Sequence, residues 1–259
     1  MRLNLVKANA GVTWVRSGIK TFARQPLALG GLFFLFIGLM SVVGIIPLLG
    51  GLATLVLLPA ATVGLLEATR YVEAGRFPMP KVLAISLTGS ASKRAAMLKL
   101  GGYYALAFLL SLAITMPIDG GEFAKLYLVG GTLSTETLQN TDIQLAAVVG
   151  TLLYIPLALL FWHAPALVYW HGVSPAKALF FSFTACWKNI GAIAVFFVSW
   201  GAIFLGVAMT MTLLAGIFGD GFLQVVVMPM ALILAAMVTV SVLSSVRDSF
   251  ADALPPLPN

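Results

Sequence analysis

The sequence predicts an all-α, polytopic membrane protein with six transmembrane helices. Of its 259 residues, 60% are hydrophobic and only 9% are charged, and the mean hydropathy is +1.03. A soluble domain carries about 25% charged residues, so most of the surface of this chain must face lipid. Its apolar runs are long enough to cross about 30 Å of hydrocarbon, and they lack the alternation of β-barrel strands.

The first apolar run starts near Leu27, after 26 residues that include five bases. It is longer than the apolar core of a cleavable signal, so we expect it to remain as a span. The six expected spans are residues 27–49, 52–71, 96–117, 143–170, 191–218 and 222–246. We expect turns at Gly50-Gly51 and at Gly219-Asp220-Gly221, because paired glycines favour tight connections.

The basic residues predict the orientation of the chain. Five lie before the first span, six between spans two and three or at their cytoplasmic ends, two between spans four and five, and one after span six. The opposite side has one base, Lys125, in a loop at 118–142 that also carries four acidic residues. By the positive-inside rule, both termini are cytoplasmic. The chain then divides into an amphipathic cytoplasmic segment (1–26), a transmembrane domain (27–246) and a disordered cytoplasmic tail (247–259).

Each expected helical hairpin follows a short amphipathic segment on the cytoplasmic side. In the first segment Val12, Val15, Ile19 and Phe22 recur at helical spacing, beside a separate row of bases. The segment at 177–188 has the same character, and the one at 81–99 is weaker. Such helices lie in the interface plane with their bases toward lipid headgroups. We interpret the pattern as three copies of an interfacial helix plus a hairpin. The alternative is that basic segments simply precede the spans, as in any inner-membrane protein.

These bases lie beside apolar runs rather than on one soluble face, so we expect anionic headgroups of the cytoplasmic leaflet as partners. The bases expected to contact headgroups are Arg16, Lys20, Arg24, Lys93, Arg94, Lys177 and Lys188. A membrane-protein partner stays open, and nucleic acid is not expected. The single cysteine, Cys186, allows no internal disulfide and provides no metal-ligand cluster, so neither a metal nor a cofactor is predicted.

Both histidines, His163 and His171, lie near the cytoplasmic end of the fourth span. Bis-histidine haem requires imidazoles from opposite faces, whereas these two are on one segment. A zinc site lacks a nearby carboxylate or thiol, and no G-x-S-x-G motif of a serine hydrolase occurs. Two hypotheses about the role of His163 stay open. It binds a proton or substrate, as ionisable groups at membrane depth often do, or it is a neutral imidazole bonded to a carbonyl freed by Pro165.

Two further patterns surround the histidines. We expect Pro156 and Pro165 to kink the fourth span, because each removes a backbone donor. After the span, Ser174 and Pro175 predict the start of the next helix, with serine as N-cap and proline at the first helical position.

Glu67 and Arg70 are the other ionisable candidates in the membrane. They are three residues apart near the cytoplasmic end of span two. This spacing favours an interfacial ion pair, and the alternative hypothesis is a functional role. The same span presents Ala60, Gly64 and Ala68 at four-residue intervals, a small-residue face suited to packing inside the protein. No other acid lies within a span, which argues against an ion-coupled pump. No phosphate-binding glycine loop or zinc-protease motif is present.

The segment APALVYWHGVSPAKALFFSFTACWKN (164–189) resembles a pattern of bacterial six-span proteins, including the membrane domain of some glycerophosphodiester phosphodiesterases. The residues that carry the pattern are Pro165, Leu167, Val168, Gly172, Ser174, Pro175, Ala178, Leu179, Ser182 and Asn189. The whole chain, with its opening MRLNLV and its RQPLALGGLFFLF, is similar to an uncharacterised inner-membrane protein family of proteobacteria. The resemblance implies six spans with interfacial helices and brings no catalytic residue.

These observations favour an inner-membrane protein without catalysis of its own. We expect an accessory role, in which the protein assembles or organises a membrane complex or the surrounding lipid. The alternative is a transporter or channel for a small apolar or lipid-like molecule, with a cavity near His163 and Glu67.

Overall fold

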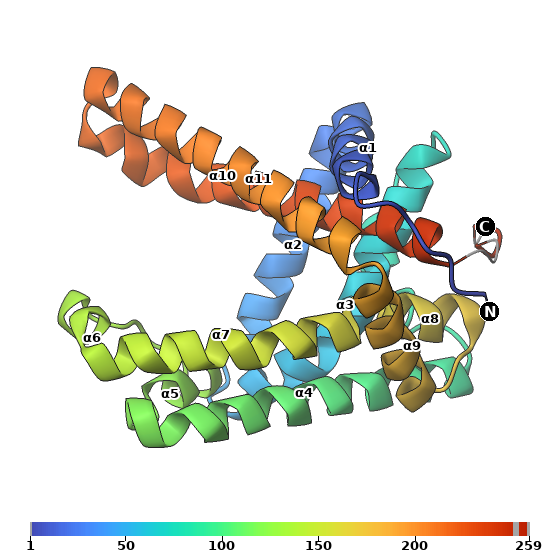
Figure 1. Cartoon of the computed structure of the whole chain (residues 1–259), viewed down its shortest axis with the longest axis horizontal. Coiled ribbons are helices and arrows are strands. Elements are labelled where there is room, and N and C mark those ends of the chain that lie inside the picture. The colour runs from blue at the N-terminus through green and yellow to red at the C-terminus, as the bar shows by residue number, and fades with distance from the viewer. Residues whose placement is uncertain (1, 251–253, 258–259) are drawn as a thin grey trace. The chain divides into compact units, whose positions relative to one another are not determined.

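The structure is a computed structural model that describes residues 2–250 and 254–257, and these are almost entirely helical (Figure 1). Within the described residues, six helical stretches are long and apolar enough to cross a membrane, which confirms the predicted fold class. The spanning helices are α2 (Pro26–Gly44), α3 (Leu49–Glu73), α4 (Ala91–Asp119), α7 (Thr141–Phe161) continued by α8 (Ala164–His171), α10 (Ile190–Phe218) and α11 (Asp220–Ser249).

The turn between the first two spans differs from the prediction. Helix α2 ends at Gly44, before Pro47 and before Leu48, whose backbone is left-handed with φ at 64°. The predicted turn at Gly50-Gly51 is wrong, because both glycines lie inside α3. A Cβ atom at Gly51 would lie only 2.9 Å from the carbonyl oxygen of Tyr127. This glycine therefore permits close packing and not a turn.

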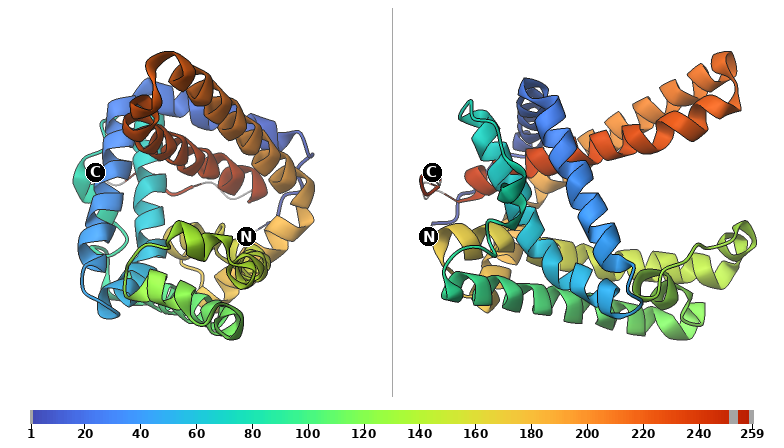
Figure 2. Two further views of the ribbon diagram at one scale, coloured as in Figure 1. Left: turned by 90° about the vertical axis from the view of Figure 1, so that its left-hand side faces the viewer. Right: turned by 180° about the vertical axis from the view of Figure 1, so that it is seen from behind.

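The chain forms two compact units. The first contains Met1–Leu35, Leu65–Val82 and Ala185–Asn259, and the second contains Phe36–Gly64 and Leu83–Thr184. In the first unit, α1 (Ala10–Arg24) packs on α10 and α11, which form a hairpin (Figure 2). In the second unit, α4 and α7 lie side by side, and α5 (Glu122–Leu128) and α6 (Thr135–Gln139) connect them (Figure 1).

Helix α1 is amphipathic as predicted, and its apolar face is covered by protein. Trp14, Val15 and Phe22 are buried. The closest approaches occur at two glycines that are seven residues apart on this face. A Cβ atom at Gly11 would lie 2.3 Å from the carbonyl oxygen of Ala192 in α10, and one at Gly18 would lie 2.3 Å from Cβ of Ser241 in α11. Helix α1 is thus an integral part of the packing of the first unit.

The residues before α1 form a strap held by side-chain amides. The backbone amide of Asn4 donates to the carbonyl oxygen of Ser249 at 2.9 Å. The amide group of Asn189, which is only 2% exposed, bonds to the strap twice. Its Oδ1 accepts from the amide of Val6 at 2.9 Å, and its Nδ2 donates to the carbonyl oxygen of Asn4 at 3.0 Å. Trp14 Nε1 also donates to a carboxylate oxygen of Asp248 at 2.7 Å. These bonds join the strap and α1 to the end of α11 and to Asn189, the residue before α10.

The middle amphipathic segment is not a separate helix, which corrects the predicted repeat. Residues 81–99 divide between the short 3₁₀ helix η1 (Pro80–Ala84), a turn, and the first residues of α4. The α4 helix begins after Ser90, whose hydroxyl accepts from the amide of Lys93. The third segment does form a helix of its own, α9 (Pro175–Lys188), which begins at Pro175 as predicted. Two of the three expected interfacial helices therefore exist as separate elements.

The predicted outer loop at 118–142 contains two short helices. Ser134 caps α6 by accepting from the amide of Thr137 at 3.1 Å. Helix α5 was not predicted. It is capped by Asp119, the last residue of α4, whose carboxylate accepts from the amides of Gly121 and Phe123 at 3.0 and 2.8 Å.

The predicted disordered tail starts inside a helix, because Arg247 belongs to α11. Residues 251–253 and 258–259 of the tail lie outside the described residues. Pro255, within the described part, accepts a hydrogen bond from Arg70 Nη2 through its carbonyl oxygen. Disorder of the tail stays a prediction.

The contact at Gly18 predicts a specific stability loss. A methyl group there would lie 2.7 Å from Cα of Ser241, an atom that cannot move without the backbone of α11. Gly18→Ala should therefore lower the free energy of unfolding by about 1–3 kcal/mol, measured as a lower thermal midpoint in detergent. Gly31→Ala is the matched control, because nothing lies within 4 Å of its added methyl group. This control should be neutral or stabilising. Equal midpoints for the two variants would contradict the packing described.

Candidate functional sites in the membrane

The fourth span is broken at Trp162 and His163, between α7 and α8. Pro165 lies at the start of α8 and has no backbone donor, so the predicted kink at this proline is confirmed as a helix break. Pro156, by contrast, lies inside the continuous helix α7. His163 itself is completely buried within the second unit.

A serine hydroxyl fills the gap in the broken helix. In an unbroken helix, the amide of His163 would donate to the carbonyl oxygen of Leu159. Here the hydroxyl of Ser182, from α9, stands between them. It accepts from the amide of His163 at 2.9 Å and donates to the carbonyl oxygen of Leu159 at 2.8 Å. Insertion of a side chain into the helical ladder is a recognised cause of a sharp kink. Sequence reasoning missed this role of Ser182.

His171 is the last residue of α8 and is half-buried. Among the described residues, no group of three or more His, Cys, Asp and Glu side chains could hold a metal ion. The site around His163 is a packed helix break, and whether its imidazole acts on a proton or a substrate stays a prediction.

Glu67 and Arg70 form the predicted ion pair, with 2.7 Å between Glu67 Oε1 and Arg70 Nη1. The pair is buried inside the first unit, because the two side chains are 1% and 7% exposed. A second charged contact lies one turn further along α3. There Glu73 pairs with Arg247 of α11 at 2.5 Å, and its backbone carbonyl accepts from Arg24 of α1 at 3.3 Å. The end of α3 thus carries two ion pairs.

The small-residue face of α3 packs inside the protein, as predicted. Ala60 and Ala68 are buried, and a Cβ atom at Gly64 would lie 2.6 Å from Cα of Leu83. The hydroxyl of Ser86 donates to the carbonyl oxygen of Ala60 at 3.1 Å. Residues 83–86 therefore occupy this face of α3 within the second unit.

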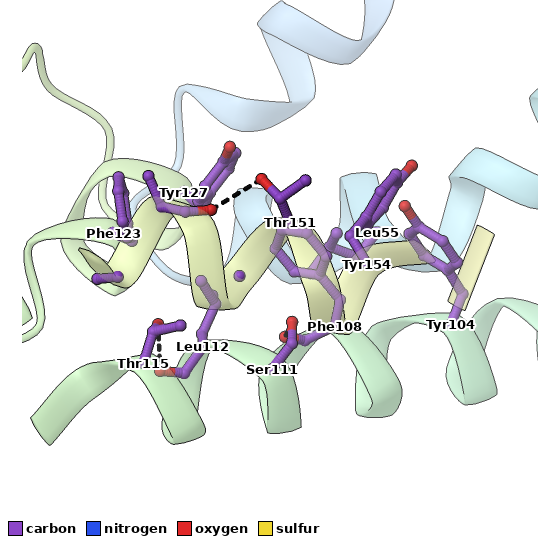
Figure 3. Close-up of a pocket in the computed structure, with 13 residues that line it drawn as sticks. Leu55, Tyr104, Phe108, Ser111, Leu112, Thr115, Phe123, Tyr127, Thr151 and Tyr154 are labelled. Carbon is purple, nitrogen blue, oxygen red and sulfur yellow. Dashed lines mark hydrogen bonds between the residues drawn. The ribbon is translucent and has the colours of Figure 1, made fainter. Parts of the chain in front are cut away.

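A pocket of about 530 Å³ lies in the second unit, among α3, α4, α5 and α7 (Figure 3). Small-molecule sites range from about 300 to 1,000 Å³. The lining residues are apolar or carry hydroxyl groups: Leu55, Tyr104, Phe108, Ser111, Leu112, Thr115, Phe123, Tyr127, Ala146, Ala147, Gly150, Thr151 and Tyr154. A cavity was predicted near His163 and Glu67. Neither residue lines this pocket.

Aromatic contacts shape the walls of the pocket. The ring of Phe108 lies edge-on to that of Tyr127, with centroids 5.2 Å apart, and Tyr104 lies edge-on to Phe161 at 5.0 Å. Sequence reasoning missed the pocket. The available signal was the recurrence of aromatic and hydroxyl side chains at helical spacing in α4, from Tyr104 to Thr115.

The bases expected at lipid headgroups are all exposed: Arg16, Lys20, Arg24, Lys93, Arg94, Lys177 and Lys188. Lys93 Nζ also lies 5.6 Å from the centre of the Tyr169 ring, a cation–π contact. The exposure of these side chains is what headgroup binding requires.

Comparison with known proteins gives one full-length similarity. The chain is 34% identical to a probable inner membrane protein of Burkholderia thailandensis over an alignment of 268 residues, which covers all of this chain and 98% of that protein. No family model matches the chain, and no solved structure matches it.

The helix break yields a prediction about Ser182. Ser182→Ala removes the hydroxyl that serves both the amide of His163 and the carbonyl of Leu159, two groups in a buried site. An unsatisfied buried polar group costs about 1–3 kcal/mol, so the thermal midpoint in detergent should fall. Ser41→Ala is the control, because that hydroxyl is exposed and bonds only within its own helix, to Ile37. A Ser182→Ala protein as stable as the control would contradict the bridging role.

Proposed function

The chain belongs to the family of the probable inner membrane protein of Burkholderia thailandensis, and on this premise we propose that it is a multi-pass inner-membrane protein without catalysis of its own. In this proposal it has an accessory role: it organises or helps to assemble a membrane complex, or the lipid around one. Its partners are anionic headgroups of the cytoplasmic leaflet, together with a membrane protein.

One observation carries this proposal, namely the two faces of α1. One face is buried against α10 and α11, and the other presents Arg16, Lys20 and Arg24 to the surroundings. A helix that is fixed to two spans in this way can hold its bases at a constant depth. Bases near an anionic surface contribute about 1 kcal/mol each to membrane attraction, so a row of three supplies a useful electrostatic contact.

The proposed orientation places both termini in the cytoplasm. Fourteen of the 15 Lys and Arg residues lie on the side of the chain that carries the termini. Supporting this, Asn4 is hydrogen bonded to the end of α11, so the segments before the first span and after the last one meet. The loop at 118–142 is then periplasmic.

The absence of catalysis is proposed from the chemistry of the sites. Glu67 and Glu73 of α3 are each engaged in an ion pair, with Arg70 and Arg247, and His163 lies at a helix break that a serine bridges. Residues 164–189 resemble the membrane domain of some glycerophosphodiester phosphodiesterases, and this resemblance brings no catalytic residue. Hydrolysis of phosphodiester or ester substrates by the pure protein, at rates above a detergent blank, would overturn this part of the proposal.

Transport of a lipid-like molecule past His163 and Glu67 ranks second. Both side chains are buried, and the pocket of the second unit is lined by neither. A His163→Ala strain that reproduces the gene-deletion phenotype, while the protein stays in the membrane at its normal level, would move this candidate to first place.

Headgroup binding predicts a change in the lipids that accompany the protein. Replacing Arg16 and Lys20 by Gln should lower the enrichment of anionic lipid about five-fold for each base removed, because each contributes about 1 kcal/mol. The measurement is mass spectrometry of lipids retained in nanodiscs of mixed neutral and anionic composition. Lys125→Gln is the control, since this exposed base lies in α5 on the proposed periplasmic side. Unchanged enrichment in the double variant would contradict the proposal.

The proposed orientation has its own test. A fluorescent protein fused after the last residue should fold and fluoresce, and alkaline phosphatase inserted at Gly130 should be active, because the loop at 118–142 faces the periplasm. The reciprocal fusions serve as controls and should both be inactive. Active phosphatase at the C-terminus would contradict a cytoplasmic C-terminus.

A further inference from the structure

The pocket of the second unit is elongated along its helices. Tyr104 and Thr115, at its two ends on α4, are eleven residues apart, which is about 16 Å of helical rise. The hydrocarbon core of a bilayer is about 30 Å thick, so this length corresponds to one leaflet. On α7 the lining runs from Ala146 to Tyr154, about 12 Å. A long, narrow occupant such as a single acyl chain matches these dimensions.

The pocket carries no side chain that would hold an ion. None of the 13 described residues that line it is Asp, Glu, Lys, Arg or His. A charged group placed there would lose its hydration without gaining an ionic partner, which is costly. The pocket therefore favours an uncharged occupant over a fatty acid or a phospholipid headgroup.

Three of the six hydroxyl groups that line the pocket are arranged to accept hydrogen bonds, and the other three belong to Tyr104, Tyr127 and Tyr154. Ser111, Thr115 and Thr151 each donate to a carbonyl oxygen of their own helix, at 2.7, 3.1 and 2.7 Å (Figure 3). Their single donor is thus in use, whereas each hydroxyl oxygen keeps acceptor capacity. A ligand that brings a hydroxyl donor would find partners along both α4 and α7. A pure hydrocarbon would leave this capacity unused.

From these three observations we propose that the pocket binds one chain of an uncharged lipid whose polar end carries a hydroxyl group, as in a mono- or diacylglycerol or a long-chain alcohol. This site is independent of the headgroup contacts proposed above, because no base lines it.

Photolabelling tests the proposal directly. The probe is a 16-carbon alcohol with a mid-chain diazirine, added to the full-length protein in nanodiscs of neutral lipid. Mass spectrometry should locate the label on the peptides that contain residues 104–115 and 146–154. The alcohol should label the pocket about five-fold more than the matching alkane, the effect of one hydrogen bond. The matching carboxylic acid should label it less than the alcohol.

Two neighbouring substitutions on α7 separate the pocket from general contact with lipid. Ala147 and Val148 are both exposed, but only Ala147 lines the pocket. Ala147→Phe should reduce labelling by about ten-fold, because the added ring occupies space that the chain needs. Val148→Phe adds the same ring outside the pocket and should leave labelling unchanged.

Three results would overturn the proposal. Equal labelling by alcohol, alkane and acid would show contact with bulk lipid only, as would equal labelling of the Ala147→Phe and Val148→Phe proteins. Crosslinks from the pocket to a second polypeptide in native membranes would show that a protein helix fills it. If Ala147→Phe does not fold, Thr151→Val replaces it. This nearly isosteric change removes a hydroxyl acceptor and should lower labelling by the alcohol but not by the alkane.

Discussion

The structure depends on one constraint: within hydrocarbon, each backbone amide and carbonyl must find its partner inside the protein. Continuous helices meet this constraint along most of each span. At the break between α7 and α8 they cannot, and the hydroxyl of Ser182 takes the place of the missing backbone bond between Leu159 and His163. The amide of Asn189 serves the strap before α1 in the same manner. One short segment of the chain thus supplies both substitutes for regular secondary structure.

The hydrocarbon of the bilayer also explains why small residues lie at the contacts between helices. Lipid tails are as apolar as leucine, so helices gain little from hydrophobic burial and associate through close packing instead. At Gly101 a Cβ atom would lie 1.9 Å from the carbonyl oxygen of Val56, and similar approaches occur at Gly11, Gly18 and Gly64. These glycines bring backbones together in both units. Any side chain at these positions would push apart the backbones that meet there.

The same constraints on backbone groups and helix packing determine which features could be predicted from the sequence. The spans follow from local apolar runs, and the break near Pro165 follows from a missing donor, so both were predicted. Gly50 and Gly51 were misread as a turn, because a glycine that permits contact looks the same in sequence as one that permits a bend. The pocket could not be predicted, since Leu55, Phe108 and Thr151 meet only after three helices have packed. The prediction of a separate helix in the middle amphipathic segment was wrong, because residues 91–99 form the beginning of the longer helix α4.

The sparse charges of the spans set a limit on what the membrane part can bind. Glu67 and Arg70 neutralise each other at 2.7 Å, an arrangement that spares each the full cost of an isolated charge in a low-dielectric site. His163 is fully buried, and the pocket has no acid or base among its described lining residues. The bases of α1, α4 and α9 named above are exposed and can contact anionic groups outside the spans. Within the hydrocarbon, selectivity must come from shape and from hydroxyl groups. In the two proposals above, the pocket selects a molecule by its length and neutrality, and the exposed bases select the leaflet by its charge.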